Sequence, residues 1–442
     1  MKSKNQVHFC WLLVVLSLWL GYCNLVSAGS DPNAQINWLI DMQDLHDTGL
    51  VESYEDITDT NSWIHDQALA IMAFTAAGKL ERAREILNIM KDLQLEDKNN
   101  AWVECYNAPD SSYAGCWKYI TGPIAWMVMS VNFYECRTGD PNYASMARMA
   151  LGWLDTMRST DPNGPLRFCE NCDIPNAIST EHNVDAYSAY YWRGMLDAND
   201  SYLYKANLIL DYLRKEMWAP TPGSNCVQDA NVFCRGYNDS GVLATDCQSW
   251  SVLSLGPVGP DGEEFYESLY WLLDSDLQTT CDFNDNIRDV NGFKSESDEQ
   301  CDYIRVDLTE SVAGALFSIG DDVNSTYFHS EMGKTVDANG LVHSFNRDEP
   351  SCADSRNYVA SAAWYYLNEV RLNPFNLRPC FAECRAANIN GTGRINFIDY
   401  AIFALDWLET GSGLAGDINR DRRVQWMDLN ILTEYWLGGC ND

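Results

Sequence analysis

Acidic side chains recur near the start of several apolar helical stretches, where carboxylates could act together as proton donor and proton acceptor. Helix capping explains about one acid per helix start, because an acid there interacts with the helix dipole. It does not explain acids further along helices whose other faces are apolar, since a buried carboxylate without a partner is costly. We therefore expect these acids to face a common polar cavity. The candidate catalytic acids are Asp66, Glu181, Asp185, Asp246 and Glu310.

Two of these acids are spaced for mutual repulsion. Glu181 and Asp185 lie at positions i and i+4 of one predicted helix, so they share a face of it. Two like charges on one face favour protonation of one of them, which raises its pKa. The pair is therefore a candidate source of a general acid.

The same helix starts carry polar and aromatic residues where the pattern would permit apolar ones. No HExxH motif accompanies His65 or His182, so we expect them to form hydrogen bonds or contact a sugar rather than bind a metal. No GxSxG motif supports a serine nucleophile. The candidate binding residues are Trp63, Gln67, Trp117, Trp126, His182, Tyr187, Gln248 and Trp250.

From about residue 33 to 370, strongly apolar helical stretches alternate with amphipathic ones. An apolar stretch at 358–367 has no partner after it, but an amphipathic stretch at 36–45 stands unpaired at the start, which makes six of each kind. The other predicted pairs are 68–77 with 80–93, 124–135 with 143–154, 186–196 with 202–213, 250–255 with 265–273, and 311–319 with 327–332.

Buried helices at this regular spacing, each covered by an amphipathic one, predict helical hairpins that close into a ring. An open helical array or two separate bundles are the alternatives. The connections into the buried helices are long, and long loops in compact domains are usually functional. We therefore expect the site at the amino-terminal ends of the inner helices. The long connections are 94–120, 159–178, 218–244 and 276–304.

The composition limits the partners and the compartment. With 63 acidic against 30 basic residues, a formal charge of −33 repels nucleic acid and suits a neutral partner such as carbohydrate, as well as divalent cations. Residues 1–28 read as an export signal, and no later run is apolar enough for a membrane span.

Of the 16 cysteines, 14 follow this signal, and an even number in an oxidising compartment favours disulfides. We expect structural disulfides rather than a redox or zinc site, because no second half-site has matching spacing. The close pairs are Cys105/Cys116, Cys169/Cys172, Cys226/Cys234 and Cys281/Cys301.

The hairpin pattern over about residues 33–376 resembles the six-hairpin glycosidase-like proteins, which fold as an (α/α)6 toroid. This resemblance implies a carbohydrate cleft at the inner-helix amino termini, with two acids across it and aromatic rings that stack on sugars. It does not identify one substrate family. The segments that carry it are HDQALAIMAFTAAGKLERAREIL, TGPIAWMVMSVNFYECRTGDPNY, STEHNVDAYSAYYW, DCQSWSVLSLG and SAAWYYLNEVRLNPF.

After residue 376 the composition shifts and a tandem repeat begins, with one copy starting at Asn388 and the other at Asp417. Oxygen-bearing residues fall at loop positions 1, 3, 5, 9 and 12 of each copy, the spacing that wraps a hard cation before a helix. The second loop, with three acids, should bind Ca²⁺ more tightly than the first. The candidate ligands are Asn388, Asn390, Thr392, Arg394 through its carbonyl, Asn396 and Asp399, and Asp417, Asn419, Asp421, Arg423 through its carbonyl, Gln425 and Asp428.

These repeats resemble a type I dockerin over about residues 384–438. The resemblance implies a cohesin as the protein partner. Asn388 and Thr392 weaken the first loop, and Arg422 stands where a turn usually has Gly. Bulky residues at positions 10 and 11, such as Phe397 and Ile398, could dock a partner or pack against each other.

The sequence therefore predicts an export signal at 1–28, an (α/α)6 toroid at 29–378 and a calcium-binding dockerin at 379–442. We expect a secreted polysaccharide-degrading glycoside hydrolase that needs no cofactor for catalysis and is tethered to a cohesin-bearing partner. Glu181 is the expected general acid and Asp66 the base, with Asp246 and Glu310 as alternates. Two other functions stay open, a polysaccharide lyase acting through Tyr187 and His182 and a non-catalytic carbohydrate-binding or assembly protein.

Overall fold

The structure is a computed structural model. The predicted export signal and most of the predicted calcium ligands lie outside the residues it describes. The described residues are 32–55, 60–159, 164–221, 230–236, 241–283, 287–297, 303–337, 340–342, 357–377, 389, 397–411, 414–418, 423–425, 428–429 and 432.

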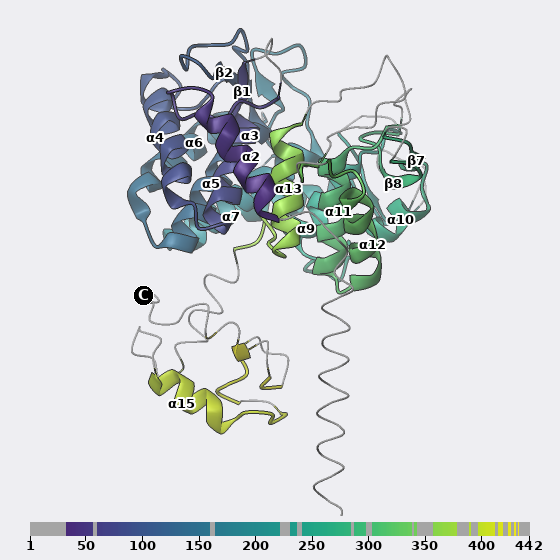
Figure 1. The fold of residues 1–442 in the computed structure, drawn as a ribbon. Helices are drawn as coiled ribbons and strands as arrows, with labels where there is room; N and C mark the ends of the chain where they lie inside the picture. The colour runs from purple at the N-terminus through teal and green to yellow at the C-terminus, as the bar shows by residue number, and fades with distance from the viewer. Residues whose placement is uncertain are drawn as a thin grey trace, which may run out of the picture.

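Six helices form a closed inner ring (Figure 1). Each contacts the next, and the last contacts the first, which closes the ring. This arrangement confirms the predicted ring and excludes an open array. The inner helices are α3 (Ile64–Ala76), α5 (Thr121–Thr138), α7 (Thr180–Leu196), α9 (Thr245–Leu255), α11 (Val306–Ser318) and α13 (Val359–Glu369).

A second helix covers each inner one. In α4, the residues Ala83, Ile86, Leu87 and Met90 are buried at the spacing of one helix face, so the opposite face meets solvent. The helix α2 packs on α13, so the start of the chain completes the last hairpin, as predicted. The outer helices are α2 (Pro32–Asp44), α4 (Leu80–Glu96), α6 (Ala144–Thr156), α8 (Asp200–Tyr212), α10 (Glu267–Asp274) and α12 (Asp322–Gly333), with the short helices η1 (Pro141–Tyr143) and η2 (Leu213–Met217) beside them.

The inner helices begin earlier than the apolar pattern predicted. For example, α7 starts at Thr180 and α9 at Thr245, about a turn and a half before their apolar stretches. The reason is that the first turns carry the polar residues singled out above. Among the described residues, no helix is both long and apolar enough to cross a membrane.

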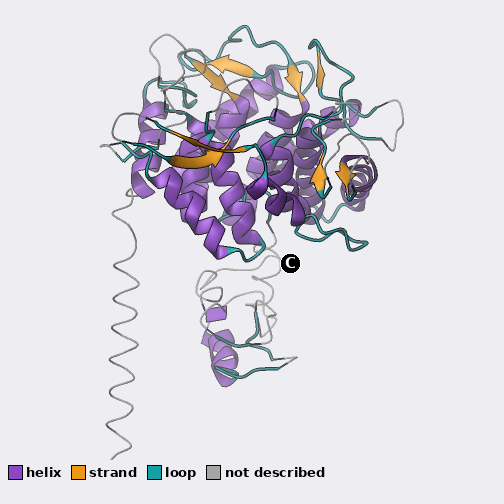
Figure 2. Cartoon of the chain, turned by 90° about the vertical axis from the view of Figure 1, so that its right-hand side faces the viewer, coloured by secondary structure: helices purple, strands orange, loops and turns teal. Residues whose placement is uncertain are grey.

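The long connections form four short antiparallel strand pairs among the described residues (Figure 2), and two of these pairs join strands from different connections. The strand β1 precedes α3 and pairs with β2, placing Trp63 opposite Cys105. The strand pairs are β1 (Asn61–Trp63) with β2 (Cys105–Asn107), β3 (Tyr119–Ile120) with β4 (Cys169–Glu170), β5 (Trp218–Ala219) with β6 (Val232–Phe233), and β7 (Gln278–Cys281) with β8 (Val290–Phe293).

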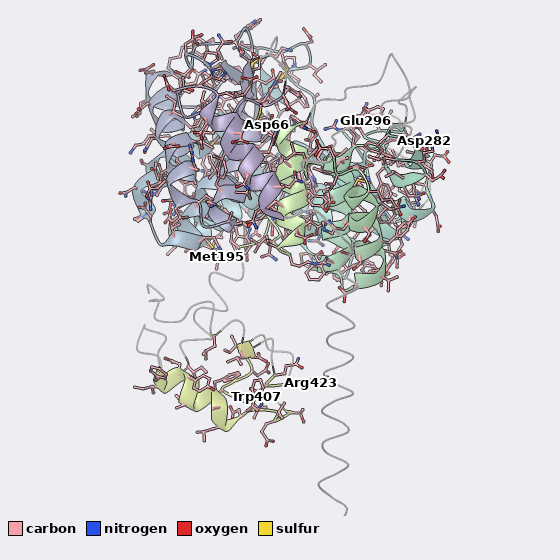
Figure 3. All side chains as sticks on the ribbon, viewed as in Figure 1. Asp66, Met195, Asp282, Glu296, Trp407 and Arg423 are labelled. Carbon is pink, nitrogen blue, oxygen red and sulfur yellow. A yellow bond between two sulfur atoms is a disulfide. The ribbon has the colours of Figure 1, made fainter. Side chains whose placement is uncertain are left out.

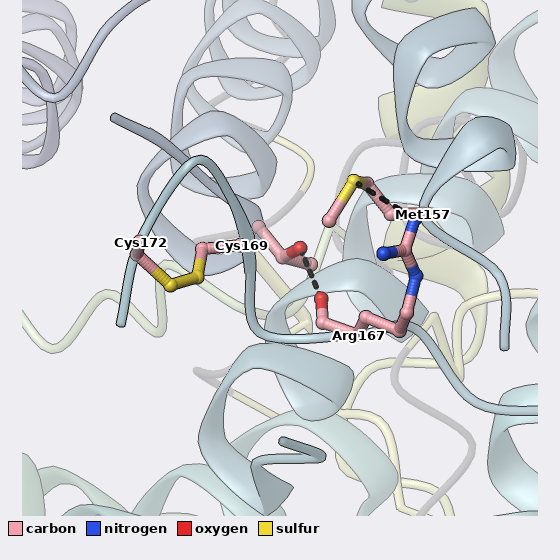
Figure 4. Close-up of a disulfide and its surroundings, with 5 residues drawn as sticks. Met157, Arg167, Cys169 and Cys172 are labelled. Carbon is pink, nitrogen blue, oxygen red and sulfur yellow. Dashed lines mark hydrogen bonds between the residues drawn. A yellow bond between two sulfur atoms is a disulfide. The ribbon is translucent and has the colours of Figure 1, made fainter. Parts of the chain in front are cut away.

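Two of the predicted disulfides form in these connections, Cys105–Cys116 and Cys169–Cys172. Figure 4 shows the second one beside Arg167. The other two predicted pairs each include a cysteine outside the described residues. Cys247, on α9, is buried and forms no disulfide in the described part of the chain.

Five of the six inner helices are joined at their first residue to the connection of a neighbouring hairpin. Apart from α7, where the Ser179 hydroxyl accepts a hydrogen bond from the His182 N–H, no described inner helix has a side-chain N-cap bond. The first backbone N–H instead donates to a loop carbonyl, which satisfies a group that a helix start otherwise leaves open. The bonds between ring neighbours are Ile64 to Glu104 (3.1 Å), Thr121 to Phe168 (3.0 Å), Thr180 to Arg235 (2.9 Å), Thr245 to Ser295 (2.9 Å) and Val359 to Ser53 (3.1 Å).

A side-chain amide at the fourth residue of three inner helices holds the same connections. Gln248 accepts from the Phe233 N–H at 2.7 Å and donates to the Phe233 carbonyl at 2.8 Å. Gln67 binds both backbone groups of Val51 in the same way. Asn183 binds both backbone groups of Leu166. We call these three residues the amide clamps.

The described part of the tail contains α15 (Phe397–Leu405) and a short backbone contact after it. The Leu408 N–H donates to the Val424 carbonyl at 2.8 Å, and the Val424 N–H donates to the Glu409 carbonyl at 3.0 Å. Phe403, Ile418, Val424 and Leu432 form its small apolar centre.

We predict that Gln248→Glu lowers the free energy of unfolding by about 1–3 kcal/mol, because a carboxylate cannot donate to the Phe233 carbonyl. Urea denaturation followed by circular dichroism measures the change. Gln278→Glu, at a partly exposed position of β7, is the control and should change stability little. Equal stability of the two variants would mean that the clamp does not hold the connection.

Candidate functional site

All five predicted acids lie in the first two turns of inner helices, and four of them belong to the cluster described here. Asp66 is on α3, Glu181 and Asp185 are on α7, and Asp246 is on α9. Figure 3 shows Asp66 toward the end of the body from which Glu296 also projects, and Met195, near the end of α7, at the opposite end. The helix amino termini therefore bring these acids to one end of the ring.

Glu181 and Asp246 interact electrostatically across the gap between α7 and α9. Burial raises the pKa of the Glu181 carboxyl well above its usual range, and the negative charges of Asp246 and Glu296 raise it further. Burial also raises the pKa of the Asp246 carboxyl. Its hydrogen bonds with Cys247 and the positive charge of Arg305 act in the opposite direction. At neutral pH this environment favours one protonated and one charged carboxyl.

Asp185 lies one turn deeper, near the interface of α7 with α5. Burial raises the pKa of its carboxyl well above the usual range, and the charges of Glu181 and Asp246 add to the effect. A Cβ atom at Gly122 of α5 would lie 3.1 Å from Asp185 Oδ2 and 2.9 Å from His182 Nε2. Glycine at this position therefore leaves room for both side chains.

Asp66 lies on α3, which stands opposite α9 in the ring. It is fully buried, and its Oδ1 lies 3.5 Å from His65 Nδ1. Burial raises the pKa of the Tyr358 hydroxyl, and the charge of Asp66 raises it further. The positive charge of Arg305 lowers it. Asp66 therefore belongs to the same electrostatic neighbourhood, which spans the ring from α3 to α11.

The centre of the ring holds a set of buried polar atoms that form no hydrogen bond with any described residue. Such groups are rare in folded proteins because each loses its bonds to water. Ordered water or a hydroxyl-rich ligand would satisfy them. The atoms are Trp63 Nε1, His65 Nε2, both carboxylate oxygens of Asp66 and of Asp185, Trp126 Nε1, His182 Nδ1 and Trp250 Nε1.

His182 is a neutral hydrogen-bonding group. Burial lowers the pKa of its imidazole to about 4, so the ring carries no charge at neutral pH. It stacks on Phe168 with ring centroids 4.3 Å apart. Among the described residues, no group of three or more His, Cys, Asp or Glu side chains is arranged to hold a metal ion.

The predicted aromatic residues occupy three different environments. Trp126 and Trp250 are buried in the ring, with His65, Trp364 and Phe375 around them, so their faces are not open platforms and their N–H groups are what they offer a ligand. Trp63 is partly exposed, and Tyr187 stacks on Tyr191. Trp117 is 62% exposed beside the Cys105–Cys116 disulfide.

The structure separates three predicted residues from this cluster. Gln67 and Gln248 are amide clamps, and each binds backbone with both ends of its amide rather than facing a ligand. Glu310 points between α11, α12 and α13, where it binds His329 Nδ1 at 2.9 Å and accepts from Asn368 at 2.6 Å. This carboxylate in the second turn of α11 has a structural counterion, which the sequence alone did not reveal.

The structure adds residues that the sequence argument did not select. Arg305 forms a two-point ion pair with Asp307, at 3.0 and 2.8 Å, and its charge reaches Glu181 and Asp246. Glu296 comes from the connection before α11, and Tyr358 immediately precedes α13. The sequence position of Arg305 and Tyr358 could have indicated them as site residues, because each directly precedes an inner helix, as Trp63 does.

Comparison with known proteins identifies the fold. No protein-family model matches the sequence, and no curated protein matches it. Among solved structures, a glycosidase variant in complex with glucose matches with a TM-score of 0.60 and 12% identity, over 78% of this chain and 96% of its own.

Two further structures match at similar levels. An alpha-amylase from Clostridium perfringens has a TM-score of 0.56 and 11% identity, over 77% of this chain and 97% of its own. A cellobiose 2-epimerase from Bacillus thermoamylovorans has a TM-score of 0.56 and 8% identity, over 77% of this chain and 98% of its own. The body of this chain is therefore an (α/α)6 toroid, and at these identities the likeness establishes the fold alone.

We predict that His329→Gln destabilises the body by about 3–5 kcal/mol near pH 6, because it leaves the buried Glu310 carboxylate without its counterion. Burial opposes the charge of His329, but Glu310 and Glu369 outweigh it and raise the pKa of the imidazole to about 10. This group is more basic when folded, so its stabilisation is complete below its unfolded pKa and is lost as the pH rises through about 10.

Urea denaturation of wild type and His329→Gln at several pH values measures this difference. It should be largest near pH 6 and disappear above pH 10. A difference that is constant with pH would show that His329 acts through packing and not through charge.

Proposed function

We propose that the body is a glycan-degrading hydrolase that cleaves glycosidic bonds with carboxylates at the amino-terminal end of the inner ring. The observation that carries this proposal is the cluster of Glu181, Asp185, Asp246 and Asp66, with raised carboxyl pKa values on α7 and α9 and unsatisfied buried oxygens on α3 and α7. Glycosidic hydrolysis needs one protonated and one charged carboxyl on opposite sides of the bond. The solved glycosidase and amylase of the same fold support this choice.

In this proposal Glu181 donates the proton to the leaving oxygen. Its raised pKa keeps it protonated at the pH where the partner acid is charged. Asp66 is the proposed base because it faces the site from α3, and Asp246 is the alternate on the neighbouring helix α9. Asp185, together with the N–H of Trp126 and of Trp250, would bind sugar hydroxyls below the acids.

Three other functions can be distinguished from hydrolysis by their products or by the lack of any product. A lyase acting through Tyr187 and His182 would leave a new double bond, which absorbs ultraviolet light. An epimerase, an activity named for one structure of this fold, would change a sugar without cleaving it. A non-catalytic carbohydrate-binding protein would bind glycan without turnover.

We predict that Glu181→Gln reduces kcat by at least about 100-fold on a glycan that wild type cleaves, because an amide cannot donate the proton. A reducing-sugar assay over a glycan panel identifies that substrate. Wild-type activity should fall as the pH rises and Glu181 loses its proton. Glu331→Gln changes a buried acid that binds Asn291 and Lys334 outside the site, and it is the matched control. Full turnover by Glu181→Gln would remove this residue from the mechanism.

Asp66→Ala and Asp246→Ala then identify the base. Azide should restore turnover only in the variant that lacks it, because a small anion can occupy the space of the missing carboxylate. The anomeric form of the first product, followed by nuclear magnetic resonance, shows whether the reaction inverts or retains configuration.

We further propose that the tail, residues 379–442, is a calcium-binding dockerin that binds a cohesin-type partner, and that the protein is secreted. The acids at position 12 of both loops, Asp399 and Asp428, are fully buried, as expected for carboxylates directed at a cation. Asp428 Oδ2 also accepts from the Gln425 N–H at 3.0 Å. Phe397 and Ile398 are 74% and 59% exposed, which favours docking over mutual packing. When bound, Ca²⁺ would neutralise the loop acids.

We predict that the full chain binds at least one Ca²⁺ per molecule and that Asp417→Ala with Asp428→Ala abolishes the tighter site. Isothermal titration calorimetry measures the stoichiometry and affinity. The Glu181→Gln variant should bind calcium as wild type does, because the two sites use different residues. Unchanged calcium binding in the double variant would contradict the assignment of the second loop.

A further inference from the structure

The segment that leaves α13 crosses the carboxyl-terminal end of the ring and is fixed to two inner helices. Asn373 donates to the Leu253 carbonyl of α9 at 2.9 Å and accepts from the Phe375 N–H at 2.9 Å. The Phe375 carbonyl accepts from Trp192 Nε1 of α7 at 2.7 Å and from Ser188 Oγ at 3.4 Å. The backbone around Phe375 is therefore held independently of its side chain.

The Phe375 ring is fully buried at the centre of three tryptophans from three inner helices. Its centroid lies 5.0 Å from that of Trp126 on α5, 5.6 Å from Trp250 on α9 and 6.4 Å from Trp364 on α13. Edge-on and tilted contacts of this kind fix the relative orientation of aromatic rings. One phenyl ring thus supports the two indoles whose N–H groups belong to the candidate site.

A hollow lies at this same end of the ring. A cavity of about 220 Å³ is lined by Leu253, Phe317, Trp364, Arg371, Asn373 and Pro374, among others. Asn373 and Pro374 directly precede Phe375, so this segment lines the cavity together with Trp364, one of the three tryptophans around the phenyl ring. If the phenyl ring were smaller, the indoles would have free volume into which they could rotate.

We propose that Phe375 is a positioning residue of the candidate site, and that it holds the N–H groups of Trp126 and Trp250 directed at the carboxylates and at a bound ligand. Burial raises the pKa of the Asp185 carboxyl and Trp126 lowers it, which places the indole of Trp126 near that site acid, and the N–H groups of Trp126 and Trp250 are both buried without a hydrogen-bond partner among the described residues. This inference rests on the proposed function for its effect on turnover, but the orientation of the indoles can be measured without a substrate.

The test compares Phe375→Leu with Phe328→Leu in the full chain. Phe328 is also buried, at 2% exposure, but it packs on Phe293 and Tyr327 between α12 and the β8 connection. Both variants should have a lowered melting temperature. Only Phe375→Leu should change the near-ultraviolet circular dichroism of the tryptophans, reduce kcat at least tenfold with a smaller change in KM, and shift the pH profile.

Phe375→Tyr keeps the ring and should preserve most of the wild-type signal and turnover. The inference is overturned if Phe375→Leu matches Phe328→Leu in both the tryptophan signal and kcat. Where Phe375→Leu does not fold, the inference is overturned if Phe375→Tyr, which keeps the ring, loses the wild-type tryptophan signal and turnover. If wild type cleaves no glycan, the proposed function fails, and an unchanged tryptophan signal would still overturn the inference separately.

Discussion

The site depends on the backbone hydrogen bonds that join each inner helix to the connection of a neighbouring hairpin. At five of the six inner helices, the first N–H donates to a carbonyl of the connection belonging to the next or preceding hairpin, and Arg305, before α11, donates instead to Phe293 in its own connection. A helix start normally needs a polar side chain or water for these groups. Here the neighbouring loop provides the acceptor, so the side chains of the first turns are released from capping and can face the axis of the ring.

The amide clamps explain why polar residues at these helix starts have two different roles. Gln67 and Asp66 are adjacent in sequence, yet one binds the backbone of Val51 and the other has no hydrogen-bond partner among the described residues. The division follows from helix geometry, since adjacent residues project about 100° apart. One face of the first turn therefore holds the connection and another face forms the site.

The regular spacing of apolar stretches was enough to predict the ring, because each inner helix must be apolar on nearly all sides to be buried between its two ring neighbours and its outer helix. The same reasoning could not separate Glu310 from the other acids. In sequence, Glu310 and Asp185 both appear as acids in the second turn of an apolar helix, and only the fold places His329 and Asn368 beside Glu310. The resemblance implied that Trp126 and Trp250 offer open ring faces to a sugar, but the structure buries these faces, because the covering ring of Phe375 comes from a segment more than a hundred residues further along the chain.

The packing of α2 on α13 has a consequence for how the chain acquires its structure. The amino-terminal helix emerges first during synthesis, but the surface that it covers is made last, from residues more than three hundred positions later. Until then, the face of α2 that packs on α13 has no native partner, although Gln43 near the end of α2 can already donate to the Arg82 carbonyl of α4. The body can therefore reach its final state only after nearly all of it has been made.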